Sequence, residues 1–344
     1  MDKFIGLDIH SATFTLAVVD DRGELVGHTK RKTSETNLIE VVSNIQGRKG
    51  LTVEEGPLAQ WVKLTLERYV DDFEVCDPKE NRWISDASYN DDATSAEKLA
   101  QLYRGGYTQA IEHPDRDGMG LRRTFLHYRD LSKQVARFKN KVKATFRQGA
   151  VKTQGGAVFE KSSRTRHLNR LSRYPALQSR AAQQLEVLDL LEKCKASTRR
   201  DMVRRARRLD QQGYNIIHGI PGAGEVITTG YMAIITTPHR FSRKNKLWRY
   251  AGYANIQRTS DGKTYEEEAD PTGNRHLNWV THQHFQQVAQ AAPARGDTNR
   301  FSRRYQRELD RGLTEDVATR VVCRKLLSVV RATWMKREPY RPTA

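Results

Sequence analysis

Apolar and polar residues alternate over short stretches at the start of the chain, in the pattern of β-strands. The segments KFIGLDIH, TFTLAVVD and ELVGHTK are separated by small or turn-forming residues, with DRG between the second and the third. Two stretches with helical spacing, SETNLIEVVSNI and PLAQWVKLTLERYV, then alternate with the short strands LTVEE and FEVCD. AEKLAQLYRGG adds a third helix that ends at glycines. The order β-β-β-α-β-α-β-α predicts a mixed α/β domain.

From Leu121 onward the pattern changes to long helices. Apolar residues recur at three- and four-residue steps as far as Phe146, which is typical of a coiled-coil-like seam. Between residues 121 and 150 a single acid, Asp130, faces nine basic residues. Charges of one sign favour phosphate binding over a merely solvated face. The basic residues are Arg122, Arg123, Arg129, Lys133, Arg137, Lys139, Lys141, Lys143 and Arg147.

A second long helix is expected at about residues 177–212, Leu-spaced at first and Arg-rich later, and it could form an antiparallel hairpin with the first. Residues 152–176 are weakly periodic and are interpreted as a connection. Beyond residue 213, IIHGIPGAGEVITTGYMAII contains a turn built on Pro221, Gly222 and Gly224 and resembles a helix-hairpin-helix element. In such an element a Gly-rich turn lets backbone N–H groups approach a phosphate. Helical spacing returns from Val317 to Trp334.

These changes predict three domains: an α/β domain at residues 1–117, a basic helical coiled-coil segment at 118–212 and a mainly α C-terminal domain at 213–344. A net charge of +18 over 344 residues indicates a polyanionic partner, above all nucleic acid. No apolar run is long enough for a membrane span, and the N-terminal segment lacks the features of a signal peptide. The three cysteines are scattered, so neither disulfides nor a zinc site is suggested, and we expect a cytoplasmic protein.

Three acids could form a metal site in the first domain. Asp8 lies inside an apolar strand, where a charge is costly unless it is paired or binds a cation. The predicted order of elements is that of a ribonuclease H-like domain, in which the first and fourth strands are neighbours, so Asp8 and Glu54 would meet. Asp92, at a helix start, could close on them. Carboxylates suit Mg²⁺ or Mn²⁺. The choice between Glu54 and Glu55 stays open, because a strand turns only one of them inward.

A second candidate is Ser260, in the turn RTSDGK. A serine in a Gly-containing turn is usually a turn residue, and no partner pattern supports a hydrolase triad. Arg258, Lys263, Arg275 and His276 are close in sequence and could bind a phosphate or steady a leaving oxygen.

Taken in order, several motifs resemble one known family, the DEDD transposases of the bacterial insertion-sequence "one-ten" family, also described as bridge-RNA-guided recombinases. The resemblance covers nearly the whole chain. It rests on GLDIH, VEEGPLAQWV, CDPKEN, DDATSAEKLAQLYR, IPGAGEVITTGYM, RFSRKNKLWRYAGY, SDGK and TGNRHL. It implies a RuvC-type, ribonuclease H-like nuclease domain, a coiled-coil segment and a C-terminal transposase domain that supplies a serine nucleophile.

The family pattern reads D, then E, then D-x-x-D-A, and finally S-x-G-K. Asp8, Glu54 and Asp92 match the first three acids and Ser260 matches the nucleophile. The fourth acid position is Ser95, a departure from the family, because a hydroxyl brings no charge and binds Mg²⁺ more weakly. Asp91, one turn before Ser95, is an alternative ligand that could compensate.

The resemblance therefore implies a DNA transposase or serine recombinase that cuts and rejoins strands through a covalent phosphoserine intermediate, with Mg²⁺ or Mn²⁺ at the acids. Its implied partners are double-stranded donor and target DNA, a structured bridge RNA and further copies of the chain, as a dimer or tetramer with sites shared between subunits. It also implies a bacterial, nucleoid-associated location. Two alternatives remain: a protein-only site-specific DNA invertase, and a catalytically weakened nucleic-acid-binding relative, suggested by Ser95.

Overall fold

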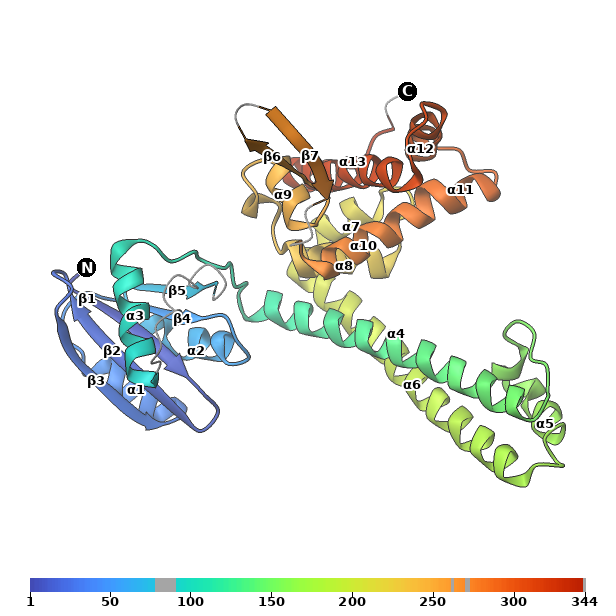
Figure 1. Cartoon of the computed structure of the whole chain (residues 1–344), viewed down its shortest axis with the longest axis horizontal. Coiled ribbons are helices and arrows are strands. Elements are labelled where there is room, and N and C mark those ends of the chain that lie inside the picture. The colour runs from blue at the N-terminus through green and yellow to red at the C-terminus, as the bar shows by residue number, and fades with distance from the viewer. Residues whose placement is uncertain (78–90, 261–262, 270–272, 343–344) are drawn as a thin grey trace. The chain divides into compact units, whose positions relative to one another are not determined.

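The computed structural model describes residues 1–77, 91–260, 263–269 and 273–342, and within 255–260 and 263–269 it describes the backbone only. The chain divides into two compact units, Met1–Arg116 and Asp117–Ala344 (Figure 1). The helical segment expected as a domain of its own, 118–212, belongs to the same compact unit as the C-terminal residues, because the two share a hydrophobic core. Each unit is described by itself below.

The first unit is built on a five-stranded mixed sheet. Its elements are β1 (Lys3–Ile9), β2 (Thr13–Asp20), β3 (Leu25–Lys32), α1 (Glu35–Ser43), β4 (Lys49–Glu54), α2 (Ala59–Leu66), β5 (Asp72–Cys76) and α3 (Asp92–Gly105). The strands lie in the order β3-β2-β1-β4-β5. β1 is antiparallel to β2 and parallel to β4, which in turn is parallel to β5. The predicted meander of three strands and the predicted pairing of the first strand with the fourth are confirmed.

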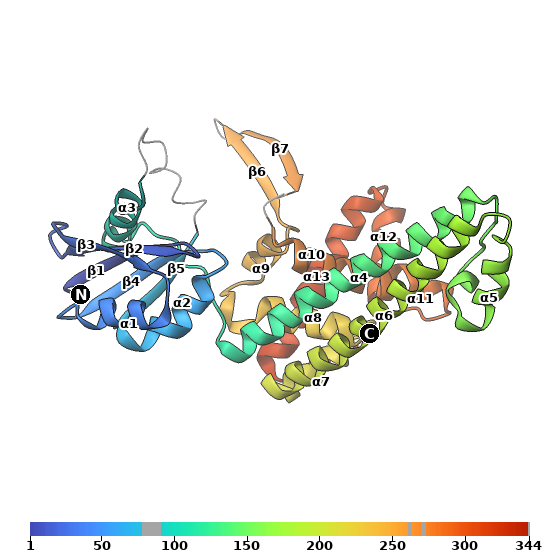
Figure 2. The same cartoon turned by 90° about the horizontal axis from the view of Figure 1, so that it is seen from below.

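Helices cover both faces of this sheet: α1 and α2 lie on one face and α3 on the other (Figure 2). The α1–α2 face holds the apolar core, with Ile5 and Leu7 of β1 beside Leu51 and Val53 of β4. Side chains alternate along a strand, so the residues between them face α3. Gly6 is one of these, and a Cβ atom there would lie 2.0 Å from the backbone oxygen of Ala96 in α3. The glycine therefore allows the helix to pack directly on the sheet.

The second unit is mostly helical. Its elements are α4 (Arg116–Gln148), α5 (Lys161–Asn169), α6 (Pro175–Leu209), α7 (Gln211–His218), α8 (Glu225–Ile235), α9 (Lys244–Tyr250), β6 (Asn255–Ser260), β7 (Lys263–Ala269), α10 (Arg275–Phe285), α11 (Ala291–Ala294), α12 (Arg300–Asp310) and α13 (Glu315–Lys336). The two strands form an antiparallel hairpin. The final helix predicted from Val317 to Trp334 is confirmed, one turn or less shorter than α13 at either end.

The long helices α4 and α6 lie side by side, and α4 ends and α6 begins near α5 (Figure 1). Along their outer halves they bury their own core, which includes Val142 and Phe146 of α4. Near the start of α4 the same apolar stripe, with Leu121 and Phe125, enters a larger core formed with α8, α10 and α13. The interpretation of residues 152–176 as a plain connection is wrong in one respect, because the segment contains α5.

The glycine turn between α7 and α8 packs inward. Gly222 has φ +79°, and a Cβ atom there would lie 3.0 Å from the Cβ of Val288. The ring of His284, fully buried in α10, lies with Nε2 2.8 Å from the backbone oxygen of Pro221 and Nδ1 3.1 Å from the Tyr231 hydroxyl. Close packing and a backbone conformation that favours glycine are thus sufficient reasons for this turn. No helix in the described part of the chain is both long and apolar enough to cross a membrane.

Candidate functional site

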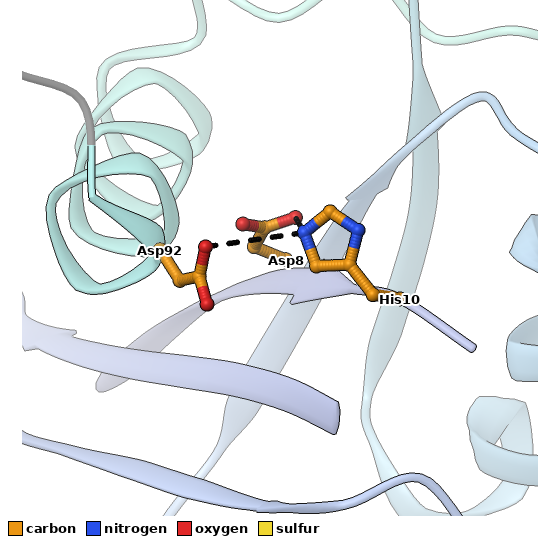
Figure 3. A group of neighbouring side chains, drawn as sticks. All are labelled: Asp8, His10 and Asp92. Atoms are coloured by element: carbon orange, nitrogen blue, oxygen red, sulfur yellow. Dashed lines mark ion pairs between the residues drawn. The ribbon is translucent and has the colours of Figure 1, made fainter. Parts of the chain in front are cut away.

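Asp8, His10 and Asp92 form a cluster at the end of β1 and the beginning of α3 (Figure 3). One ligand atom from each of the three side chains lies within 4.8 Å of the other two. The Nε2 atom of His10 is 3.5 Å from Oδ1 of Asp8 and 4.0 Å from Oδ1 of Asp92. Asp8 is 23% exposed and Asp92 38%, so the cluster is open to a ligand from solvent.

The local sequence explains why these side chains converge. Asp8 follows Gly6 by two positions and so points to the same face, toward α3. At the other side, Asp91 is the N-cap of α3, and its carboxylate accepts a hydrogen bond of 2.7 Å from the backbone N–H of Thr94. The cap fixes the first turn of the helix and directs the next residue, Asp92, toward the sheet. Of two adjacent aspartates, one therefore caps the helix and the other joins Asp8.

A lysine balances part of this negative charge. Lys30, on β3, donates a hydrogen bond of 2.7 Å from Nζ to Oδ2 of Asp92. This bond lowers the pKa of Asp92 and raises the pKa of Lys30. Burial raises the pKa of Asp8, His10 acts in the opposite direction, and the nearby charge of Asp92 raises it further. Asp8 is therefore less readily ionised than an exposed aspartate, and His10 and Lys30 offset this effect in part.

The register of the sheet bears on the choice between Glu54 and Glu55. Because Leu7 pairs with Val53, the next residues, Asp8 and Glu54, extend from the same face at the end of β1 and β4. Glu55 instead forms an ion pair with the ring of His113, which is 5% exposed and also contacts Gln60. The geometry favours Glu54 as the acid on the side of the site, although its carboxylate is not among the three groups that lie within 4.8 Å of one another.

Ser95 lies three residues after Asp92 on α3, and residues at this spacing share a helix face. Its neighbour Ala96 is fully buried against the sheet, while Ser95 itself is half-buried. The position expected for a fourth acid is thus next to the cluster along the helix, and the side chain there is a neutral hydroxyl.

The donor set fits a divalent cation. Two carboxylates are oxygen ligands of the kind that Mg²⁺ and Mn²⁺ prefer, and the imidazole of His10 is a ligand that Mn²⁺ tolerates. Thr15, which pairs with Asp8 across the strands, has a buried hydroxyl that makes no hydrogen bond to any residue in the described part of the chain. Lys30 supplies the positive charge that a cation would supply, and at 57% exposure its side chain is free to turn away. Asp8 and Asp92 would hold the ion.

Ser260 is the last residue of β6 and pairs with Lys263 across the hairpin. The side chains of Arg258, Ser260 and Lys263 lie outside the described residues. Arg275 begins α10, behind the N-cap Asn274. The second unit contains Ser260 and the first contains the acids, so the chain separates the two sets of predicted catalytic groups.

One group of the predicted nucleic-acid-binding residues forms a compact positive cluster where α4 passes α10. The guanidinium of Arg129 lies 4.3 Å above the ring centroid of Trp279, and its Nη1 is 2.6 Å from Nδ1 of His276. Burial lowers the pKa of His276 to about 4, and the charges of Arg129, Arg275 and Lys133 add to this effect. His276 is therefore neutral at pH 7 and accepts the hydrogen bond from Arg129.

The outer half of α4 carries five more of the predicted basic residues: Arg137, Lys139, Lys141, Lys143 and Arg147. Some of them have partners. Lys139 forms an ion pair of 2.7 Å with Glu192 of α6. Lys141 and Lys143 lie over phenylalanine rings, at 4.8 and 5.7 Å from the ring centroids. These contacts orient long side chains along the helix pair and leave a surface of mostly one sign.

Two residues of the acidic cluster were not expected from the sequence. His10 follows Asp8 by two positions in GLDIH, and strand alternation could have placed it on the same face. Lys30 is distant from Asp8 and Asp92 in sequence, and no pattern in its strand indicates an ion pair with Asp92.

The fold and this site define a protein with an acidic cluster in an α/β unit and a strongly basic helical unit. Residues 214–306 match the model of the transposase IS116/IS110/IS902 family. The matched segment runs from α7 to α12 and includes Ser260. This segment of the chain is therefore similar to the insertion-sequence transposases. Comparison with curated proteins gave no match.

Proposed function

We propose that the protein is a transposase that cuts and rejoins DNA through a covalent phosphoserine intermediate on Ser260. The observation that carries the proposal is the convergence of Asp8 and Asp92. The two residues are distant in sequence, and their carboxylate oxygens lie within 4.8 Å of each other, close enough to share a metal ion. The family match over residues 214–306 supports the same assignment for the segment that contains Ser260. The ribonuclease H-like character of the first unit belongs to this proposal and is supported by its strand order.

In the proposed reaction, Asp8 and Asp92 would hold Mg²⁺ or Mn²⁺, with Glu54 on the same side of the sheet. The bound ion would neutralise charge on the scissile phosphate. The hydroxyl oxygen of Ser260 attacks phosphorus and loses its proton, an ester bond to Ser260 forms, and one sugar oxygen leaves as a hydroxyl. The new phosphoserine ester retains the energy of the broken bond, so attack by another strand's hydroxyl reseals DNA and regenerates serine. The acids belong to the first unit and Ser260 belongs to the second.

The same proposal includes the partners. The basic surface of α4 would contact phosphates of donor DNA, target DNA and a bridge RNA that selects both. The protein would act as a dimer or tetramer associated with the bacterial nucleoid. RNA that co-purifies with the protein, and loss of strand exchange after its removal by ribonuclease, would support guidance by RNA. Strand exchange that is unchanged by ribonuclease would instead support a protein-only invertase.

The test of the chemistry is the substitution Ser260→Ala, measured against Thr259→Ala as the matched loss of a neighbouring hydroxyl. The reaction contains the DNA that flanks the coding region and the RNA transcribed from that DNA. Denaturing gel electrophoresis separates the products. We expect Ser260→Ala to abolish both the protein–DNA adduct and strand exchange, while Thr259→Ala retains them. An adduct or exchange that persists in Ser260→Ala would falsify the serine mechanism.

A second candidate function is that of a catalytically weakened relative that binds nucleic acid. It is favoured by Ser95 at the fourth acid position and by the Lys30 ammonium bound to Asp92. The variants Ser95→Asp and Ser95→Asn are of similar size and differ in charge, and Mg²⁺ titration of DNA cleavage compares them. Cleavage that rises in Ser95→Asp alone would indicate a weakened native site. Equal cleavage by the wild type and both variants would show that the native ligands suffice.

A further inference from the structure

A cationic pocket of about 900 Å³ lies between α9, α12 and α13 in the second unit. None of its lining residues is among those that the sequence predicted to bind nucleic acid, and the proposed chemistry does not use them. Seven of the ten lining side chains are lysine or arginine, and none is acidic. This concentration of one charge on a concave surface is the feature that requires an explanation.

α12 supplies one wall of this pocket. Arg300, Arg303, Arg304 and Arg307 follow one another at steps of three, one and three residues, so all four lie on one face of the helix. Arg303, Arg304 and Arg307 are exposed. The positive charges on this face of α12 repel one another, and a bound anion would remove this unfavourable electrostatic energy.

The opposite face of α12 holds the helix in place. Asn299 and Ser302 form a capping box at its start. Phe301 is 1% exposed and stacks on Tyr340. Glu308, one turn after Arg304, is 2% exposed, and its Oε1 lies 2.6 Å from the Nε of Arg304 in an ion pair. Burial of one face fixes the rotation of the helix, so the arginines on the other face are held toward the pocket.

α9 and α13 complete the walls. Lys244 and Trp248 share a face of α9, and the indole Nε1 of Trp248 donates a hydrogen bond of 3.1 Å to the hydroxyl of Ser328 on α13. The guanidinium of Arg324 lies 5.8 Å from the ring centroid of Trp248, and its Nε donates a hydrogen bond of 2.6 Å to the backbone oxygen of Tyr253. Trp248 is thus a fixed apolar surface within a ring of cations.

Lys325 also lines the pocket and lies close to several of these cations. Burial lowers the pKa of its ammonium, and the neighbouring charges of Arg300, Lys244 and Arg304 lower it further. The pocket is therefore a region of positive potential.

We propose that this pocket binds the phosphodiester backbone of a nucleic-acid strand, with several phosphates held by the arginines of α12. Guanidinium groups pair with phosphate oxygens through two parallel hydrogen bonds, which suits a wall of arginines more than a wall of lysines. A volume of about 900 Å³ exceeds the need of one phosphate and accommodates a short length of strand. Trp248 offers a surface for a sugar or an unstacked base. The inference rests on the proposed function in one respect, since that function makes nucleic acid the expected polyanion.

The experiment compares Arg303→Gln/Arg307→Gln with a control, Arg173→Gln/Arg180→Gln, which removes two exposed arginines near the start of α6. Full-length proteins bind fluorescein-labelled duplex DNA, single-stranded DNA and single-stranded RNA, and fluorescence anisotropy gives affinities from about 50 to about 200 mM salt. For duplex DNA we expect the pocket variant to lower the slope of log affinity against log salt by about 2, because each lost phosphate contact contributes about 0.9. The slope of the control should stay nearer that of the wild type.

A third variant, Arg303→Lys/Arg307→Lys, keeps the charges and removes the two-point geometry. It should retain the salt slope while its affinity falls by about threefold to tenfold. All the substituted side chains are exposed, so none of these substitutions should lower the thermal stability of the protein, which circular dichroism measures. If the glutamine variant nevertheless unfolds, the lysine variant still tests the proposal.

The outcomes separate the pocket from the proposed function. The nucleic acid that loses most affinity identifies whether DNA or RNA occupies the pocket. If the wild type binds none of the three, the proposed function fails. If the wild type binds but the pocket variant has the same slope and affinity as the control, the pocket inference alone fails. Loss of poly-glutamate binding with unchanged nucleic-acid binding would assign the pocket to an acidic protein partner and would also overturn the inference.

Discussion

Gly6→Ala should damage both the fold of the first unit and its acidic cluster. An alanine Cβ at this position would lie 2.0 Å from the backbone oxygen of Ala96 and 2.5 Å from the backbone nitrogen of Ala100. Cβ atoms do not approach other atoms within 3.0 Å, so α3 would have to withdraw from β1 by about 1 Å or more. Forced insertion of one methyl group into packed structure costs about 1–3 kcal/mol, and we expect about 3 kcal/mol here because both obstructing atoms are backbone.

The same movement opens the site, because Asp92 is in the first turn of α3 and Asp8 is on β1. Gly27→Ala is the matched control, since a Cβ at Gly27 meets nothing within 4 Å. Hydrogen exchange of the full chain, followed by mass spectrometry, reports the stability of peptides from β1 and α3. Isothermal titration with Mn²⁺ reports the site.

A loss of about 3 kcal/mol corresponds to roughly 100-fold faster exchange through local opening. We expect this acceleration, together with weaker Mn²⁺ binding, in Gly6→Ala and not in Gly27→Ala. Exchange in α3 of Gly6→Ala within about twofold of the wild type would refute the argument that the glycine sets the distance between helix and sheet.

Two further substitutions test the electrostatics. Lys30→Met should tighten Mn²⁺ binding by about threefold to tenfold, because the Lys30 ammonium competes with the ion for Asp92. Titration calorimetry compares this variant with the control Arg31→Met, and equal Mn²⁺ affinities of the two would contradict the prediction. His284 has its pKa lowered to about 4 by burial, so the fold binds its proton less readily than the unfolded chain does. The contribution of neutral His284 to the free energy of unfolding is complete above pH 6.5. It declines as the pH falls toward 4, by up to about 3 kcal/mol in all. Denaturant unfolding at pH 7 and pH 4 should show a smaller loss in His284→Gln than in the control His239→Gln, and equal losses would count against the assignment.

Elements with a clear period were predictable from the sequence. Alternating residues gave the three strands of the meander, and the order of elements gave the pairing of β1 with β4. α5 was missed because few of its residues are apolar and none is buried. The surrounding segment is held instead by Val158 and Leu171, single buried residues that produce no period.

The domain division shows a different limit. The stripe on α4 reads as a continuous coiled-coil seam, and it is one in its outer half, where Val142 faces α6. Leu121 and Phe125 continue the same spacing but pack into the core with α8 and α10. A periodic pattern identifies the face that is buried and does not identify what covers it. The pattern therefore could not reveal that α4 joins the C-terminal residues in one compact unit.

In the acidic cluster, Asp8 could be predicted because a charge in an apolar strand needs a partner. The roles of Glu54 and Glu55 could not, since neighbouring residues on a strand differ only by register, and the pairing of Leu7 with Val53 supplies that information. Lys30 could not be predicted either. A lysine on an outer strand is common, and only the sheet order β3-β2-β1 brings it across β2 to the site.

Lys30 and Ser95 both affect the net charge around Asp92. A fourth carboxylate at position 95 would add negative charge one helical turn from Asp92. Burial already raises the pKa of Asp8, and the charge of Asp92 raises it further. The chain has a neutral side chain there and an ammonium 2.7 Å from Asp92. The neutral Ser95 and the ammonium of Lys30 both leave the cluster with less negative charge, so both oppose the binding of a divalent cation. Asp91 does not offset them, because its carboxylate caps α3. If the cluster binds a metal as proposed, its affinity depends on how easily Lys30 leaves Asp92, and a substrate phosphate, which attracts the same ammonium, would favour that release.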